Sequence, residues 1–148
     1  MNQINPENVC SHLYKDYTKD FNGDMLETIL SIQKKLQIKI EKEKNSKDFN
    51  DLTFKERMNR LDQHWRNLCV EYGEFMDKLP YKEWKNYSKE VLEGDFPEKD
   101  WLEIKYELID MAHFFFNMCI YMGIDSKEFF NLYVSKNEEN FDRQERNY

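Results

Sequence analysis

Two pairs of carboxylates, each separated by three positions, are the residues of this chain best suited to chemistry: Glu71 with Glu74, and Glu107 with Asp110. Residues three apart lie on one face of a helix, so each pair points two carboxylates in the same direction. Both pairs lie within runs of apolar residues, where an isolated charge is costly unless a cation or dense hydrogen bonding compensates it. A divalent cation would compensate all four carboxylates at once, and the pairs therefore predict a metal site.

The donor atoms of this predicted site indicate which ion it would hold. Ligation by oxygen alone favours a hard cation, and Mg²⁺ typically combines a few carboxylates with waters and substrate phosphates. Such an ion polarises a phosphoryl oxygen, and a second one can lower the pKa of the attacking water. The pattern thus points to the hydrolysis of a phosphate ester or anhydride.

Three other interpretations compete with a magnesium site. Because 34% of the residues are charged, such pairs also occur by chance on solvated helix faces. A di-iron bundle normally presents Glu-x-x-His on two helices, but His113 follows Asp110 by three positions rather than Glu107. Zinc is disfavoured because no C-x-x-C or H-x-x-x-H spacing links the cysteines and histidines, which are Cys10, Cys69, Cys119, His12, His64 and His113.

The elements that must position these carboxylates are predicted to be helices throughout. The chain has only four glycines and three prolines, and apolar residues recur every three or four positions, without strand-like alternation. Capping signals occur at Thr53-x-x-Glu56 and Asp125-x-x-Glu128. The pattern predicts an all-α fold with a four-helix core and short accessory helices, in the ranges 25–44, 53–80, 81–92, 97–123 and 125 to the C-terminus.

Burial can be predicted from the same pattern. In the first long helix an apolar stripe is formed by Leu26, Ile29, Leu30, Ile32, Leu36 and Ile40. The helix over 97–123 is apolar nearly all round from residue 108 to residue 122, so we expect it to be the most buried element. A turn is expected at 93–96, with Pro97 in the first turn of this helix, and residues 1–23 have no clear period beyond one short helix.

Bulk properties bound the class of protein. A chain of 148 residues fits a single domain, 1–148, in which residues 1–23 form an N-terminal extension. A net charge of −7 argues against general binding to nucleic acid or anionic lipid. The start of the chain lacks a basic region followed by an apolar region, and no long apolar run occurs. We therefore expect a soluble, cytoplasmic protein with reduced thiols and no membrane partner.

Three ordered segments carry a resemblance to a known family. Residues 71–85, 107–114 and 136–144 together resemble the dimeric all-α dUTPases of the MazG-like NTP pyrophosphatase superfamily, over roughly residues 25–148. The resemblance implies the four-helix core of that type and a homodimer that hydrolyses dUTP to dUMP and pyrophosphate. It also implies Mg²⁺ as cofactor, bound by Glu71, Glu74, Glu107 and Asp110. Glu71 or Glu74 would assist deprotonation of the attacking water.

The resemblance also implies a set of substrate-binding residues. In the C-terminal segment, basic and amide side chains suit phosphate and the edge of a pyrimidine. Tyr81 replaces a family tryptophan, and Gln37 stands where the family has asparagine. The implied substrate-binding residues are Gln33, Tyr81, Lys82, Trp84, His113, Lys136, Asn137, Asn140 and Arg143.

Two alternatives to dUTP hydrolysis remain open at this stage. A MazG-like pyrophosphatase acting on dCTP, or on several nucleoside triphosphates, would keep the same residues and chemistry. A non-catalytic helical module that binds a nucleotide or another protein would keep the fold without the reaction. Substitution of Glu74 separates the enzyme from the module, because only an enzyme loses its main function while it keeps its fold.

Overall fold

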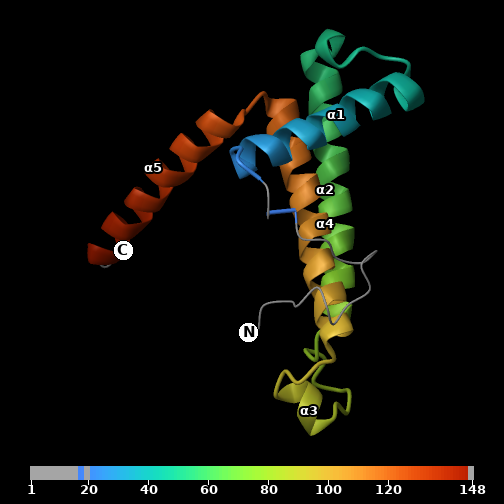
Figure 1. Ribbon diagram of the computed structural model, residues 1–148, viewed down its shortest axis with the longest axis vertical. Coiled ribbons are helices and arrows are strands. Elements are labelled where there is room, and N and C mark those ends of the chain that lie inside the picture. Colours follow the sequence, from blue (N-terminus) through green and yellow to red (C-terminus); the bar gives the residue numbers. More distant parts are fainter. Residues whose placement is uncertain (1–16, 19–20, 147–148) are drawn as a thin grey trace. The chain divides into compact units, whose positions relative to one another are not determined.

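The computed structural model describes residues 17–18 and 21–146, which form helices and no strand (Figure 1). Four helices are long and two are short, which confirms the predicted all-α class. The elements are α1 (Met25–Asn45), the 3₁₀ helix η1 (Phe49–Asp51), α2 (Phe54–Asp77), α3 (Lys89–Leu92), α4 (Glu98–Met122) and α5 (Ser126–Glu145). The short helix expected before residue 23 falls mainly outside the described residues.

Side-chain caps explain where α1, α2 and α5 begin. The Asp24 carboxylate accepts from the backbone N–H of Glu27 at 2.8 Å, and Asp125 accepts from Glu128 at 2.8 Å. At α2 the predicted capping box is present, because the Thr53 N–H donates to Glu56 Oε2 at 2.9 Å and the Glu56 N–H donates to Thr53 Oγ1 at 3.3 Å. These bonds satisfy amides that a helix N-terminus leaves without intrahelical partners.

The connections differ from expectation at two places. Helix α3 covers only Lys89–Leu92, and the residues before it form turns instead of the predicted helix over 81–92. Helix α4 begins at Glu98, so Pro97 precedes it, and the Pro97 carbonyl accepts from the Trp101 N–H at 3.0 Å. At its other end Gly123 has a φ of 82°, a conformation that costs little only for glycine and that ends the helix as predicted.

The chain divides into two compact units, and α2 and α4 each contribute to both. Of the described residues, the first unit contains 17–18, 21–22 and 64–115, and the second contains 23–63 and 116–146. Whether the chain behaves as the single domain expected from its length stays a prediction. Among the described residues, no helix is long and apolar enough to cross a membrane.

The second unit is organised around one apolar cluster. The Phe49 and Tyr121 rings pack with centroids 5.1 Å apart, and the Arg57 guanidinium lies 5.2 Å from the Phe49 ring centroid. Arg57 also donates to the backbone carbonyls of Phe49 and Tyr121. The buried members of the cluster are Leu30, Phe49, Leu52, Ile120 and Tyr121, and Leu26, Leu61 and Phe116 pack against them.

The predicted apolar stripe of α1 is buried only in part, at Leu30 and at Leu26, which packs against the cluster. Apart from Leu30, the buried residues of α1 are polar: Gln33, Gln37 and Glu41. Much of the predicted apolar stripe is exposed, with Ile32 59% and Leu36 47% accessible. The periodicity correctly predicted that this segment is a helix. Which face of α1 is buried is determined by the polar residues of the second unit that contact it.

A buried ion pair explains the polar inner face of α1. Glu41 is fully buried and accepts from Arg60 Nε at 2.5 Å, from the Tyr121 hydroxyl at 2.7 Å and from Asn45 Nδ2 at 2.9 Å. Burial raises the pKa of Glu41, but the hydrogen bonds from Arg60, Tyr121 and Asn45 together outweigh it and leave the pKa below its usual value. These bonds join α1, α2 and α4 within the second unit.

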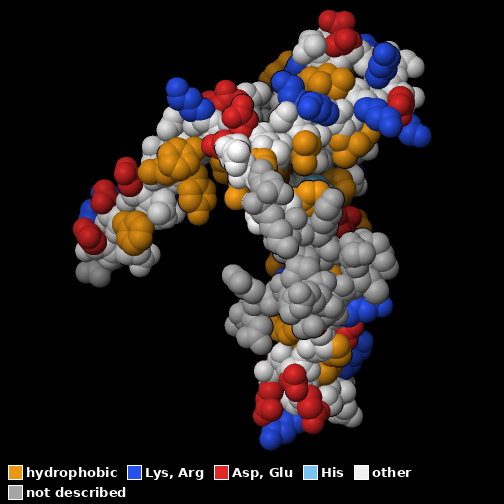
Figure 2. Space-filling model, in the orientation of Figure 1, with side chains coloured by type: hydrophobic (Ala, Val, Ile, Leu, Met, Phe, Trp, Pro, Cys, Tyr) orange, Lys and Arg blue, Asp and Glu red, His pale blue; other side chains and the backbone are white. Residues whose placement is uncertain are grey.

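Helix α4 has more buried residues than any other described helix, as predicted, although it is not buried all round. It supplies buried residues such as Leu102, Ile104 and Tyr121, but Leu108 and Ile109 are 46% and 50% accessible. Apolar side chains are also exposed along α5, as Figure 2 shows, and they include Phe130 and Tyr133. Apolar side chains are therefore accessible on both α4 and α5.

The capping box of α2 makes a testable pH dependence. A backbone hydrogen bond from Thr53, its hydroxyl and then Lys47 lower the pKa of Glu56 from 4.5 to about 2. A carboxylate whose pKa is lower in the folded protein than in the unfolded protein stabilises the fold when the pH is above its pKa in the unfolded protein. This contribution is lost as the pH falls through its pKa in the folded protein. We therefore expect wild type to be more stable than Glu56→Gln at pH 6, with the difference shrinking between pH 4.5 and 2. Urea unfolding of both proteins across this pH range measures the difference in stability. A difference that does not change with pH would contradict the expectation.

Candidate metal centre and substrate-binding residues

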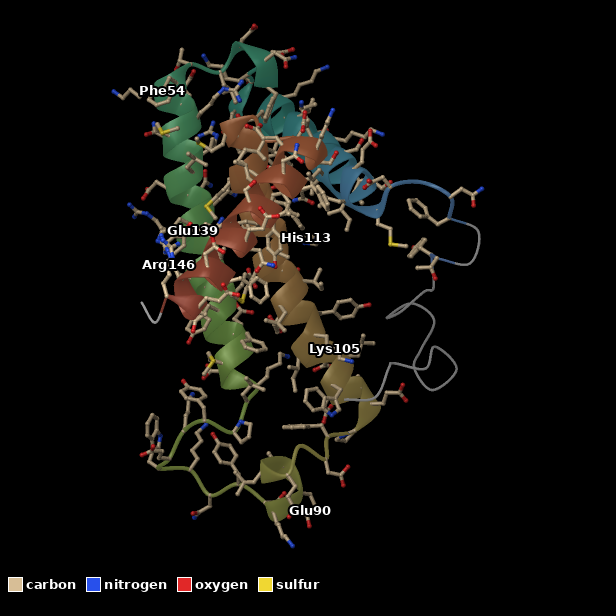
Figure 3. All side chains as sticks on the ribbon, turned by 90° about the vertical axis from the view of Figure 1, so that its left-hand side faces the viewer. Phe54, Glu90, Lys105, His113, Glu139 and Arg146 are labelled. Carbon is tan, nitrogen blue, oxygen red and sulfur yellow. The ribbon has the colours of Figure 1, made fainter. Side chains whose placement is uncertain are left out.

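The structure brings carboxylates from the two predicted pairs together within the first unit. Helix α2 supplies Glu71 and Glu74, helix α4 supplies Glu107, and one carboxylate oxygen from each residue lies within 4.8 Å of the others. The lower parts of α2 and α4 lie side by side in this unit (Figures 1 and 3). Three converging carboxylate oxygens form the kind of donor set that a hard divalent cation prefers.

The charges of this acidic trio (Glu71, Glu74 and Glu107) repel one another. Partial burial, followed by the negative charges of Glu74, Asp110 and Glu107, raises the pKa of Glu71. Asp110 is thus close enough to act on Glu71 but is not one of the trio, and its Oδ1 lies 3.5 Å from Nδ1 of His113. A bound cation would remove the repulsion, so the residues present fit such an ion.

The trio is more accessible than the apolar sequence context suggested. Glu71 and Glu107 are half-buried, while Glu74 is exposed. Neighbours expected to shelter them are themselves accessible, with Val70 exposed to 57%. Burial therefore does not set this site apart, whereas the convergence of the carboxylates does.

A lysine contacts the α4 side of the trio. Lys78 follows the last residue of α2, and its Nζ lies 3.3 Å from Glu107 Oε1 and 3.5 Å from Glu103 Oε2. The hydrogen bond to Glu107 contributes most to raising the pKa of Lys78. The ammonium therefore neutralises part of the negative charge at the edge of the trio.

The turn after α2 carries three predicted substrate residues. Lys82 pairs with Asp77, and its Nζ lies 5.4 Å from the ring centroid of Tyr81. Trp84 is 79% exposed and Tyr81 is 45% exposed. An indole left so accessible is available to stack on a planar ligand.

The remaining predicted substrate residues lie on three helices. His113 is exposed on α4 of the first unit, where Figure 3 labels it. Gln33 lies on α1 of the second unit, buried, and donates from Nε2 to Asn117 Oδ1 at 2.8 Å. Its direct contact with a substrate stays a prediction, as do those of the other substrate residues.

The C-terminal segment lies on the second half of α5. Lys136, Asn137 and Asn140 are exposed there. Arg143 Nε donates to Glu139 Oε1 at 2.9 Å, and Arg146 lies 3.7 Å from the same carboxylate (Figure 3). A phosphate would have to compete with Glu139 for Arg143.

Sequence reasoning missed Lys78, Glu103 and Asn117. A signal for Lys78 was present, because it follows Glu71 by seven positions and therefore lies on the same face of the predicted helix over 53–80 as the first pair. Glu103 similarly precedes Glu107 by four positions. No local signal marks Asn117, because its partner Gln33 is 84 positions away.

The described helices place three carboxylates where a divalent cation could bind, and comparison with known proteins gives the family. A family model described as dUTPase matches residues 25–131, so the chain belongs to the dUTPase family, whose members are nucleotide triphosphate pyrophosphatases. The chain is 29% identical to the dCTP pyrophosphatase of Enterobacteria phage T4 over an alignment of 170 residues. The alignment covers 95% of this chain and 98% of that protein.

Two further relatives are similar over most of this chain. The dCTP pyrophosphatase of Enterobacteria phage LZ5 is 30% identical over 168 residues, covering 95% of this chain and 98% of the relative. A phage T4 protein named DNA replication protein is 28% identical over 160 residues, covering 88% of this chain but 40% of that protein. No solved structure is significantly similar to this chain.

Proposed function

We propose that this protein hydrolyses dCTP to dCMP and pyrophosphate. The observation that carries the proposal is the similarity to two proteins named dCTP pyrophosphatase, which extends over nearly the full length of both chains. These relatives favour the dCTP alternative over the dUTP specificity that the family resemblance first indicated. dUTP remains the second candidate, because the matching family model is described as dUTPase.

We further propose that Mg²⁺ is the cofactor and that Glu71, Glu74 and Glu107 hold it, with Asp110 nearby. The support is the approach of one oxygen from each member of the trio to within 4.8 Å, together with the raised pKa of Glu71. When bound, the ion supplies Lewis-acid stabilisation of phosphoryl oxygens. Glu71 or Glu74 then accepts the proton of the attacking water.

The substrate contacts are proposed from residue chemistry and the family resemblance. Lys82, Lys136 and Arg143 suit the phosphates, because ammonium and guanidinium groups form charge-assisted bonds with oxyanions. Gln33, Asn137, Asn140 and His113 suit the base and sugar, since an amide offers both a donor and an acceptor to a cytosine edge. Tyr81 and Trp84 are candidates for stacking.

We also propose that two copies form a homodimer, as in the MazG-like dUTPases that the chain resembles. Support comes from exposed apolar side chains such as Ile32 on α1, Ile109 on α4 and Phe130 on α5. Large exposed apolar patches commonly mark protein interfaces. A dimer would remove part of this surface from water.

A substrate panel tests the proposed function. Steady-state rates with Mg²⁺ are measured for dCTP, dUTP, dTTP and CTP, and the products are separated by chromatography. We expect dCMP and pyrophosphate from dCTP, with kcat/KM at least about tenfold above that for dTTP. The reason is that protein amide groups that bind the N4 amino group of cytosine are left unpaired when thymine takes its place.

The other outcomes of the panel are equally informative. A preference for dUTP would restore the first prediction, and equal rates for all four nucleotides would contradict specificity for any one base. Tight binding without hydrolysis would instead support the non-catalytic module. Inorganic phosphate as the product, in place of pyrophosphate, would contradict cleavage between the α and β phosphates.

A further inference from the structure

The ammonium group of Lys78 lies at the edge of the acidic trio. Its Nζ is 3.3 Å from Glu107 Oε1, and Glu107 also provides one of the three oxygens that lie within 4.8 Å of one another. A second contact, to Glu103 Oε2 at 3.5 Å, holds the ammonium from the other side. One carboxylate is thus shared between a lysine and the group of oxygens that could bind a metal.

The position of Lys78 along the chain makes this contact specific. It lies seven positions after Glu71 and four after Glu74, directly after the last residue of α2. Glu103 and Glu107 are four apart on α4 and receive the ammonium between them. The Lys78 side chain is 36% exposed and that of Glu107 is 15% exposed, so solvent only partly screens the interaction.

We propose that Lys78 competes with the divalent cation for Glu107. This inference rests on the proposed metal site. With no metal bound, the ammonium neutralises Glu107 and limits repulsion within the trio. For the metal to bind, Glu107 must give up its hydrogen bond to the Lys78 ammonium and coordinate the cation instead. The divalent cation must also approach the positive charge of Lys78. Lys78 therefore weakens metal binding in the absence of nucleotide.

Competition has a consequence that a purely structural ion pair does not have. Removing the ammonium frees the Glu107 carboxylate and removes a like charge from the neighbourhood of the cation, so metal affinity must rise. If Lys78 only joined α2 to α4, its loss would leave the affinity unchanged or lower it, since the carboxylates would be held less well. The direction of the change thus distinguishes the two roles.

The experiment is a calorimetric titration of nucleotide-free protein with Mn²⁺, which substitutes for Mg²⁺ at oxygen sites. We compare wild type with Lys78→Met, Lys78→Arg, the matched control Lys99→Met, and Glu71→Gln, which removes one proposed ligand. Lys99 Nζ lies 3.9 Å from Glu103 Oε1, so the control removes the same charge from the same neighbour without touching Glu107. Circular dichroism and the melting temperature establish that each variant is folded.

We expect Lys78→Met to bind Mn²⁺ about three- to tenfold more tightly than wild type, a range consistent with one partly screened charge. Lys78→Arg and Lys99→Met should stay within about twofold of wild type. Unchanged or weaker binding by Lys78→Met, when wild type binds and Glu71→Gln does not, overturns the competition while the metal site stands. If neither wild type nor Lys78→Met binds Mn²⁺, both the metal site and the competition are wrong.

Discussion

Glu71→Gln should lower nucleotide hydrolysis by about a hundredfold to a thousandfold, the range typical for the loss of one group that stabilises charge in a transition state. Glutamine keeps the size and one oxygen of the side chain but loses the negative charge. Glu71 has two proposed roles, as a metal ligand and as a candidate acceptor of the proton from water. The measurement is kcat at saturating nucleotide and Mg²⁺, together with Mn²⁺ affinity.

Stability provides the internal control for this variant. Because partial burial, and then the neighbouring carboxylates, raise the pKa of Glu71, its charged form destabilises the metal-free fold at neutral pH. A neutral side chain relieves both costs. We therefore expect Glu71→Gln to melt at the same temperature as wild type or higher. The matched variant Glu93→Gln, which alters an exposed pair with Lys89, should retain activity within about twofold. An active Glu71→Gln protein would remove the main support for the proposed centre.

Arg60→Met should lower the free energy of unfolding by about 3 to 5 kcal/mol, the range for a buried ion pair that loses one partner. Glu41 is fully buried, and Arg60 provides two of its hydrogen bonds, at 2.5 and 3.0 Å. Methionine fills a similar volume but leaves the carboxylate without its opposite charge. Urea unfolding at pH 7 measures the loss.

An exposed ion pair on α1, the helix that carries Glu41, calibrates the Arg60 result. Lys39 lies 4.0 Å from Glu43, with both side chains mostly exposed, and Lys39→Met should cost no more than about 0.5 kcal/mol.

The stability loss of Arg60→Met should also depend on pH. In wild type the lowered pKa of Glu41 gives stability that is lost as the pH falls through the pKa of Glu41 in the folded protein. In Arg60→Met the pKa of Glu41 should instead be raised, so that acid favours the folded state. The gap between the two proteins should therefore narrow below about pH 5, and a small, constant gap would contradict the structural role of the pair.

Helix boundaries were predictable from the sequence because they depend on neighbouring residues. Thr53 with Glu56, and Asp125 with Glu128, form the caps that their spacing indicated. Gly123 ends α4 for the same local reason, because its positive φ suits glycine. The segment 81–92 was harder to predict, because a short helix has little propensity of its own and depends on its surroundings.

The candidate site was predictable in part. The spacing of Glu71 and Glu74 determined that both point from one helix face, and the apolar pattern of α4 placed Glu107 in a helix. The membership of Glu107 in the trio, the position of Asp110 just outside it and the contact from Lys78 all depend on how α2 and α4 pack in the first unit. Spacing within a helix says nothing about which residue of a second helix lies opposite.

The amino-acid sequence by itself determined the helical elements, their caps and the direction shared by each carboxylate pair, because a 3.6-residue period and a capping bond involve residues within a few positions. Only the tertiary structure decided that α1 buries Gln33, Gln37 and Glu41 in preference to Ile32 and Leu36. A polar face can be buried only where partners satisfy its hydrogen bonds. Those partners, Arg60 and Tyr121 for Glu41 and Asn117 for Gln33, come from distant parts of the chain.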